Sequence, residues 1–334
     1  MSGTQAWGFT DDRGARSGAA RAPGRVVAYV RAGAALYDLG VTPVAVYGSG
    51  HDGDVYDPAK AGVLEAVGVP YLGPGRGLDE AVLRELRPDV VVDVTYDGKN
   101  PYALDAALVE RLGVPLIALS VGGGALDLPA MLDRFAALAA DLRVTGPVDV
   151  GPVVTGPRDA SPADADPVVP GPRAANPVVV GSDAVGPEIV TPVTVSPAVG
   201  PGQGAALAEF EAAEAALREA AARSALGVLA LSGAGPDQVH LARPQAWPEL
   251  AWLAGLGVRL LDPGPGPGAN WLTTGWEHAA GLRPDLVLFD NRDHATPPYA
   301  LPGGVRLAPW NPETPPSAAA YARFFRDLAE ALAP

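Results

Sequence analysis

Short apolar runs alternate with amphipathic stretches along the first part of the chain. Runs rich in valine, such as Val90-Val91-Val92, are typical of strands buried on both faces of a sheet. Strands that alternate with helices pair in parallel, with the strand tips and the loops after them at one edge. The pattern predicts strands at 26–29, 42–47, 90–94 and 115–119, and helices at 34–39, 78–86, 104–112 and 130–142.

The same alternation returns in the last part of the chain. It predicts strands at 228–231, 258–261, 286–289 and 305–308, and helices at 248–256, 276–282 and 318–332. Two phrases also recur between a helix and a strand: Leu86-Arg87-Pro88-Asp89 matches Leu282-Arg283-Pro284-Asp285, and Leu39-Gly40-Val41 matches Leu256-Gly257-Val258. The recurrence predicts two similar lobes, although such phrases are also common joints between a helix and a strand.

A segment of different composition separates the two halves. Residues 145–203 are rich in Pro, Gly and Val, and frequent prolines prevent helices and interrupt strand ladders. We predict a largely disordered insertion; a set of short edge strands is the alternative, because Val favours strands. Residues 205–224 follow as the clearest helix, which at about 1.5 Å per residue is long enough to join two lobes. Its apolar stripe consists of Leu207, Phe210, Ala213, Leu217 and Ala221.

Charge and composition restrict the partners. The formal net charge of −14 repels phosphate backbones and anionic lipid headgroups, so we expect neither nucleic acid nor a membrane surface as a partner. The absence of cysteine excludes disulfides, thiolate metal sites and a lipid anchor on cysteine. Residues 1–16 lack the apolar core of a signal peptide, and no apolar run approaches the roughly 20 residues of a membrane helix. The expected location is cytoplasmic for the sequence as written, and extracytoplasmic if a signal segment precedes it.

Polar and aromatic side chains follow the predicted strands, where two-lobed α/β proteins bind their ligands. Guanidinium groups bind carboxylate, catecholate and hydroxamate oxygens, and Tyr and Trp supply flat surfaces with a polar edge. Such walls suit a large, oxygen-rich, partly apolar ligand. Each arginine could instead form a surface ion pair, and each tryptophan could belong to the core. The candidate ligand-binding residues are Tyr29, Arg31, Tyr47, Tyr96, Arg243, Trp247, Trp271 and Arg292.

Other motifs are weaker. The loop His51-Asp52-Gly53-Asp54, with Asp57 close behind, has the residue types of a zinc or manganese site. We favour a polar loop without metal, because the other three histidines are scattered. The glycines of 264–268 alternate with prolines, which lack the N–H groups that a phosphate loop needs. No nucleophile–base arrangement stands out. We therefore expect no enzyme activity, no cofactor and no metal site.

The order of several weak motifs is more informative than any one of them. The stretch Phe9-Thr10-Asp11-Asp12-Arg13-Gly14 leads into Arg25-Val26-Val27-Ala28, and the two Leu-Arg-Pro-Asp phrases enter later strands. This order resembles the substrate-binding proteins of iron–siderophore, haem and cobalamin ABC importers: an N-terminal hairpin, a first strand, two strand-entry phrases and one long helix between lobes. The resemblance covers residues 7–143 and 204–332, and it implies ligand binding between the lobes and delivery to an ABC permease.

Three features depart from that family. The signal peptide and the anchor cysteine are missing, and the insertion at 144–203 stands before the linking helix. Members of the family usually carry an exposed glutamate on each lobe that engages arginines of the permease. The matching position is Glu277 in the second lobe, whereas in the first lobe it is Ala81, with Glu80 beside it. Glu80 and Glu277 are therefore the candidate docking residues. Whether the protein has a permease partner is a question that the sequence leaves open.

The sequence thus predicts an α/β protein with two Rossmann-like lobes of mainly parallel sheets, joined by one long helix. The expected parts are a lobe at 1–143, the insertion at 144–203, a linking helix at 204–224 and a second lobe at 225–334. The predicted function is binding of a small metal chelate, a ferric siderophore, by a monomer for ABC-type uptake. The alternatives are an enzyme like the two-lobed nucleotide-sugar glycosyltransferases, and a protein that binds zinc or manganese directly.

Overall fold

The first lobe is built on a five-stranded parallel sheet. The computed structural model describes residues 6–124, 126–143, 201–298 and 301–333, so the predicted insertion lies almost entirely outside the described residues. The strand order is β5-β4-β3-β6-β7, the order of a doubly wound fold. The strands are buried on both faces, as their valine-rich runs predict. They are β3 (Val26–Tyr29), β4 (Ala45–Gly48), β5 (Tyr71–Pro74), β6 (Val90–Thr95) and β7 (Leu116–Ser120).

Helices connect these strands, and four of the five begin at an aspartate. The carboxylates of Asp57, Asp79, Asp105 and Asp127 each accept a hydrogen bond from a backbone N–H of the first turn, which caps the helix. The exception is the helix that contains Arg31, which starts directly at the end of β3. The helices are α1 (Val30–Asp38), α2 (Pro58–Ala61), α3 (Glu80–Leu86), α4 (Ala106–Leu112) and α5 (Leu128–Leu142).

An antiparallel hairpin of β1 (Trp7–Thr10) and β2 (Arg16–Ala19) precedes the first sheet. Asp11 fixes its turn, because one carboxylate oxygen accepts the N–H groups of Arg13 and Ala15. The other oxygen accepts the N–H of Ala118 in β7, so the hairpin is attached to the sheet. The N-terminal hairpin expected from the sequence is confirmed.

The second lobe contains a mixed five-stranded sheet in the order β10-β9-β8-β11-β12. Strands β8, β11 and β12 are parallel, as predicted, but β9 pairs antiparallel with both of its neighbours, β8 and β10. The prediction of a strand at 258–261 is wrong: Leu260 makes one isolated bridge to Val228, because β9 occupies the edge of β8 beyond it. The strands are β8 (Val228–Gly233), β9 (Val239–Ala242), β10 (Trp271–Thr274), β11 (Leu286–Asp290) and β12 (Arg306–Trp310), and the helices are α7 (Pro248–Gly255), α8 (Trp276–Gly281) and α9 (Ala318–Leu332).

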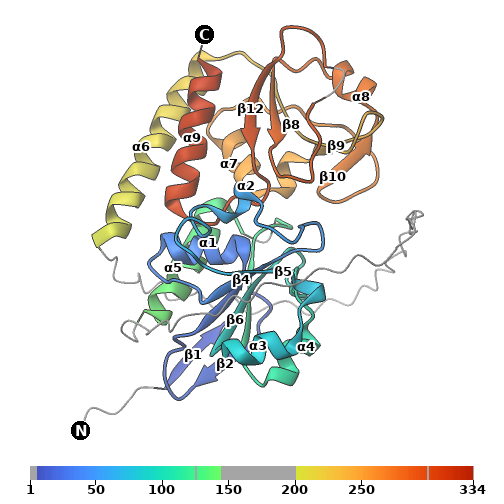
Figure 1. The fold of residues 1–334 in the computed structure, drawn as a ribbon. Helices are drawn as coiled ribbons and strands as arrows, with labels where there is room; N and C mark the ends of the chain where they lie inside the picture. The colour runs from blue at the N-terminus through green and yellow to red at the C-terminus, as the bar shows by residue number, and fades with distance from the viewer. Residues whose placement is uncertain (1–5, 125, 144–200, 299–300, 334) are drawn as a thin grey trace, which may run out of the picture. The chain divides into compact units, whose positions relative to one another are not determined.

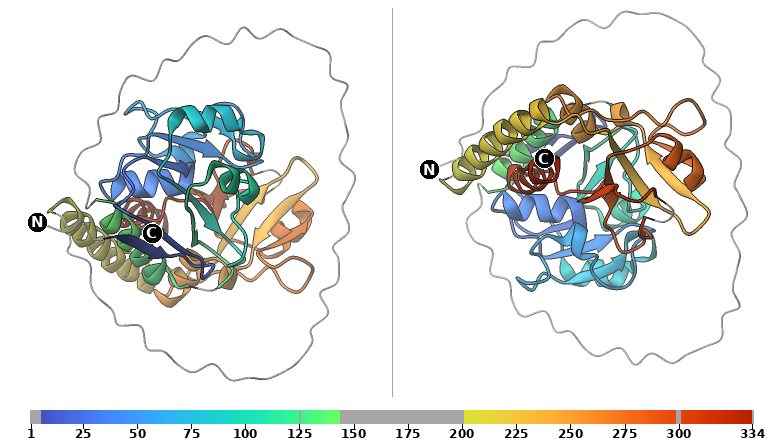
Figure 2. Two further views of the ribbon diagram at one scale, coloured as in Figure 1. Left: turned by 90° about the horizontal axis from the view of Figure 1, so that it is seen from below. Right: turned by 90° about the horizontal axis from the view of Figure 1, so that it is seen from above.

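The long helix α6 (Pro201–Arg223) packs along the C-terminal helix α9. Figure 1 shows the two side by side, and the views in Figure 2 agree. The rings of Phe210 and Phe325 lie 5.4 Å apart in this contact. Leu207, which we assigned to the apolar stripe, is 44% exposed, so the buried stripe begins one turn later. Among the described residues, no helix is both long and apolar enough to cross a membrane.

Candidate functional site

The two lobes are joined by a hydrogen-bonded network around Glu313, in the loop after β12. Its carboxylate accepts a hydrogen bond from the Tyr29 hydroxyl at 2.8 Å and pairs with Lys60 at 2.5 Å, both from the first lobe. Within its own lobe it pairs with Arg292 at 3.4 Å. Burial raises the pKa of Glu313, but the charges of Lys60 and Arg292 outweigh that effect and hold it at about 2. The acid is therefore ionised and ties the lobes together.

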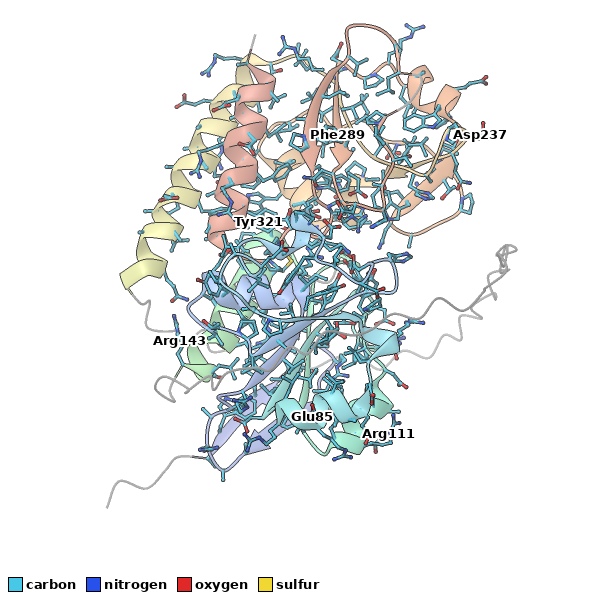
Figure 3. All side chains as sticks on the ribbon, in the orientation of Figure 1. Glu85, Arg111, Arg143, Asp237, Phe289 and Tyr321 are labelled. Carbon is cyan, nitrogen blue, oxygen red and sulfur yellow. The ribbon has the colours of Figure 1, made fainter. Side chains whose placement is uncertain are left out.

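Arg31 lies inside this junction rather than on its surface. It is the second residue of α1 and 0% exposed, so the prediction of a loop position after the strand is wrong. Its guanidinium donates to the Thr314 carbonyl of the second lobe and to the Tyr96 hydroxyl, both at 3.0 Å. Glu249 of α7 and Tyr321 of α9, the latter labelled in Figure 3, are buried near it and act on its pKa. Arg31 is thus a buried positive charge that is hydrogen-bonded to the Tyr96 hydroxyl.

Tyr29 and Tyr47 are equally inaccessible, with 0% exposure. The Tyr47 hydroxyl donates to the Val92 carbonyl of β6 at 3.4 Å. The Tyr29 ring packs on Tyr47 at 6.2 Å and edge-on against Tyr102 at 5.7 Å. Both tyrosines are thus buried at the carboxyl ends of their strands.

Tyr96, Tyr102 and Arg292 form the accessible part of the site. The rings of Tyr96 and Tyr102 lie 4.9 Å apart and edge-on. Arg292, just after β11, donates to the Asp290 carboxylate at 2.6–3.2 Å and keeps 10% of its side chain exposed. Burial raises the pKa of both tyrosines, and the charge of Arg292 opposes this effect to a smaller extent. Arg292 is linked to these rings through Glu313, which pairs with Arg292 and accepts the hydroxyl of Tyr29, and the Tyr29 ring packs on Tyr102.

The contacts of Arg243, Trp247 and Trp271 are structural contacts within the second lobe. The Arg243 guanidinium donates to the carbonyls of Gly264, Gly266 and Gly268 at 2.8–2.9 Å, which fixes the glycine–proline loop. Trp247 is buried and donates from Nε1 to a backbone carbonyl. Trp271 is partly exposed and packs on Trp247 at 4.9 Å. Their assignment to ligand binding stays a prediction.

The candidate docking glutamates differ in their surroundings. Glu80, in the first turn of α3, pairs with Arg84 at 2.7 Å and with Arg111, labelled in Figure 3, at 2.9 Å. Hydrogen bonds from Arg111 and Arg84 lower the pKa of Glu80. Glu277 lies exposed in the first turn of α8. Only Glu80 would have to exchange existing partners in order to dock.

A cavity of about 250 Å³ opens beside the junction. Pro58 and Ala59 of α2, Asn291 and Asn311 after the strands, and Arg323 of α9 are among its lining residues. This volume is below the roughly 300–1,000 Å³ of pockets for drug-sized ligands. A siderophore would need more room than this cavity offers.

Three residues of the junction escaped the sequence analysis: Lys60, Glu249 and Glu313. Only Lys60 carried a usable signal, since it is one of two lysines in the chain. The others stand in helices or loops without a motif, and their roles depend on contacts between the lobes. Tyr102 could have been found, because it follows the same strand as Tyr96 by a few residues.

Solved structures share the fold over nearly the whole chain. DesE, a ferric-siderophore receptor protein from Streptomyces coelicolor, is 22% identical with a TM-score of 0.71, and the match covers 98% of this chain and 97% of DesE. The siderophore periplasmic binding protein of the fuscachelin gene cluster of Thermobifida fusca is 12% identical, with a TM-score of 0.53 and coverage of 93% and 96%. The periplasmic haem-binding protein RhuT from Roseiflexus sp. RS-1 is 15% identical, with a TM-score of 0.53 and coverage of 92% and 97%. No protein-family profile and no curated protein matches the chain. The fold is therefore that of these two-lobed binding proteins.

Proposed function

We propose that this protein binds a ferric siderophore at the facing strand ends of its two lobes, outside the cytoplasm, and presents it to an ABC permease without chemical change. The network that links Arg292 through Glu313 and Tyr29 to the paired rings of Tyr102 and Tyr96 carries the proposal. The proteins that share its fold, DesE among them, are named as receptors or binding proteins for siderophores and haem. Binding of a metal chelate is the broader proposal, and the ferric siderophore is the narrower one.

The charge distribution supports an anionic, oxygen-rich ligand. The chain as a whole carries −14, yet a partly exposed guanidinium stands at the strand ends. A guanidinium donates charge-assisted hydrogen bonds to carboxylate or hydroxamate oxygens, and each is worth on the order of 1.5–3 kcal/mol. A repulsive surface with a local cation selects small anions over large polyanions.

The state of Tyr96 favours a siderophore over haem. A siderophore surrounds its iron with its own oxygens, whereas haem iron takes an axial ligand from the protein, such as a tyrosinate. The Tyr96 hydroxyl already accepts a hydrogen bond from the buried Arg31 guanidinium, which leaves its own proton to be donated. Tyr96 is thus suited to donate a hydrogen bond to a chelate rather than to ligate iron.

Quenching of tryptophan fluorescence tests the proposal. Ferric hydroxamate and catecholate siderophores, haem and cobalamin are titrated into the protein, with the iron-free chelators as controls. A ferric siderophore should bind most tightly. If haem or cobalamin binds and no siderophore does, the narrower proposal fails; if none of them quenches, the broader one fails as well.

Matched variants locate the site. Arg292→Lys retains the charge that Asp290 and Glu313 need but lacks the planar fork, and it should weaken siderophore binding about 10-fold. Tyr96→Phe and Tyr102→Phe should each cost several-fold. Tyr71→Phe is the control, because its hydroxyl binds the Gly53 carbonyl. Equal siderophore affinities in all four variants would show that the ligand does not bind at Arg292, Tyr96 and Tyr102.

Docking to a permease is a separate part of the proposal. Glu277→Gln should reduce siderophore uptake in the native host and leave binding by the purified protein unchanged. Glu80→Gln should have a smaller effect, because Arg84 and Arg111 already engage this carboxylate. The control is Glu219→Gln, on the exposed face of α6, with a side chain that is 73% exposed. Normal uptake by the double variant Glu80→Gln, Glu277→Gln would contradict the assignment.

A further inference from the structure

Two aspartates of the first lobe meet a histidine of the second. Asp52 and Asp57 stand in the segment between β4 and α2, and His294 follows β11. One donor atom from each of the three lies within 4.8 Å of the others. The His51 ring is a fourth nearby donor, with its centroid 5.7 Å from that of His294. The group therefore draws on separate strand ends of both sheets.

Backbone hydrogen bonds hold the carboxylates in place. One oxygen of Asp57 caps α2 by accepting the Ala59 N–H, and the other accepts the N–H of Asp293 at 3.1 Å. Asp293 is the residue before His294, so this bond fixes the position of the histidine relative to Asp57. Asp52 accepts the N–H of Ser49 at 2.6 Å. Donors that are oriented before binding lose little conformational freedom when a ligand arrives.

The charges around this group do not balance. Asp52, Asp290 and Glu313 are almost completely buried carboxylates, and Asp57 is a fourth. Three cations stand among them: Lys60, Arg292 and the buried Arg31, whose charge acts on Glu313. Four negative against three positive groups leave a formal charge of −1 within this junction. Buried charge without compensation is costly, and a bound cation would offset it.

We propose that Asp52, Asp57 and His294 bind one Zn²⁺ ion, with His51 as a fourth ligand, and that the ion joins the two lobes. Two carboxylates and two imidazoles are the oxygen and nitrogen donors that zinc takes at four-coordinate sites. Lys60 does not block the site, because it bonds one oxygen of Asp52 and each carboxylate offers several lone pairs. This zinc site differs from the proposed siderophore site, because it uses other side chains and binds a metal ion that carries no chelator.

Zinc binding to the untagged, chelator-treated full chain tests the proposal directly. Isothermal titration with zinc chloride should give one ion per chain, and metal analysis after dialysis should give the same number. His294→Ala should lower the affinity by at least about 100-fold, and His51→Ala by about 10-fold. Both histidines are exposed, so neither change should alter folding. The control is His278→Ala on α8, which should bind zinc like the original protein.

Thermal melting tests the connection between the lobes. Zinc should raise the melting temperature of the original protein and of His278→Ala, but not that of His294→Ala. Cobalt should replace zinc and give the visible absorption of a tetrahedral nitrogen–oxygen site. The proposal fails if the chain binds no zinc at millimolar concentration. It also fails if His294→Ala binds and responds to zinc as His278→Ala does, because the ion would then contact only one lobe.

Discussion

The two lobes end their equivalent helices α1 and α7 in the same way. Gly40 and Gly257 have φ values of 85° and 96°, which lie in the left-handed region. The next residues, Val41 and Val258, each bond back to the carbonyl five residues earlier. Such bonds satisfy carbonyls that the end of a helix leaves free. The recurrent Leu-Gly-Val phrase is therefore one local structure used twice.

The Leu-Arg-Pro-Asp phrase is also the same structure in both lobes. Arg87 and Arg283 are the only non-glycine residues with positive φ in the described part of the chain, at 45° and 52°. The aspartate then accepts N–H groups at the start of the first strand: Asp89 bonds Gly24 and Arg25, and Asp285 bonds Gly227. The phrase thus ends a helix and sets the register of the next strand beside the first.

The lobes differ at the other edge of their first strand. In the first lobe the segment after Leu-Gly-Val becomes β4 and pairs with β3. In the second lobe the matching segment makes one bridge, and β9, with β10 paired beside it, takes the remaining edge. Strand β10 carries Trp271 into contact with Trp247 and Trp310. The repeated phrases fix the centre of each sheet, whereas the edges are free to become different walls of a binding site.

The largest predicted effect breaks the connection between the lobes. Glu313→Ala leaves Lys60 and Arg292 buried with fewer partners, and it should lower the free energy of unfolding by about 3–5 kcal/mol. Urea unfolding at neutral pH measures this loss. The effect should fade below pH about 4.5 and vanish below about 2, because the stability that a depressed pKa supplies is lost as pH falls through the folded value.

Exposed ion pairs provide the control for that comparison. Glu80→Ala removes two partners at the surface of the first lobe, where water screens the charges. Its unfolding midpoint should stay close to that of the original protein. If Glu313→Ala were equally mild, the junction around Glu313 would not hold the lobes together.

The second prediction concerns Glu249, a buried acid of α7 whose pKa is affected by the charge of Arg31. Burial raises the pKa of Glu249 to about 7, although the charge of Arg31 lowers it. A folded value above the unfolded value of about 4.5 makes the ionised acid destabilising, and this cost develops as pH rises from about 4.5 to about 7. Glu249→Gln should therefore be more stable than the original protein at pH 8, by on the order of 2–3 kcal/mol.

Unfolding midpoints between pH 4.5 and 8 measure this difference. The gap between Glu249→Gln and the original protein should open with rising pH and become constant above pH 7. Glu65→Gln is the control at an exposed site of the first lobe, and its curve should follow the original protein throughout. Parallel curves for Glu249→Gln would show that its carboxyl group does not titrate in this range.

Local sequence signals were enough for most of the fold. Valine runs, capping aspartates and the two repeated phrases act within a few residues, so β3, β6, β11 and most of the helices could be predicted, although α2 was missed and α1 begins four residues earlier than expected. The antiparallel pair of β9 and β10 could not, because Val239-His240-Leu241 is short and its partner strand lies about thirty residues further on, beyond α7. The strand expected at 258–261 failed for the same reason, since competition for one edge of β8 decides it.

The site was harder to predict than the fold. The sequence singled out Tyr96 and Arg292 as candidates because polar residues after parallel strands share one edge, and their part in ligand binding stays a prediction. It did not show that Arg31 belongs to a helix that starts at once after β3, or that Arg243 holds the loop at 264–268. Burial of a charged residue depends on partners from the other lobe, and no pattern along the chain records them.

The third prediction tests whether the two Leu-Gly-Val turns are equivalent. Gly40→Ala and Gly257→Ala should each cost about 1 kcal/mol, because an L side chain in the left-handed region is strained. The nearest atoms to an added Cβ lie at 3.5 Å and 4.0 Å, so the strain is conformational rather than steric. Gly255→Ala, at the last residue of α7 with open space around it, should instead be stabilising. Losses that differ between the two turns by more than about 0.5 kcal/mol would argue against their equivalence.

The smallest effect is expected at the arginines of the Leu-Arg-Pro-Asp phrases, where a residue with a side chain adopts a backbone conformation that favours glycine. Arg87 and Arg283 adopt left-handed conformations that cost an L residue about 1–2 kcal/mol, whereas glycine adopts them freely. Glycine also gains freedom in the unfolded chain, which costs about 0.5–1 kcal/mol on folding, so the net gain of Arg87→Gly or Arg283→Gly should be about 0.5 kcal/mol. The two gains should be equal, because the two φ values differ by little, and should add in the double variant, because the sites lie in separate lobes.

The control variant Arg218→Gly, inside α6, should lose stability instead, since a helix interior disfavours glycine. Chemical unfolding of the four variants measures these small differences. A loss of stability at either phrase would mean that the arginine side chain itself supports that lobe, and the two phrases would then share a backbone shape without sharing a role.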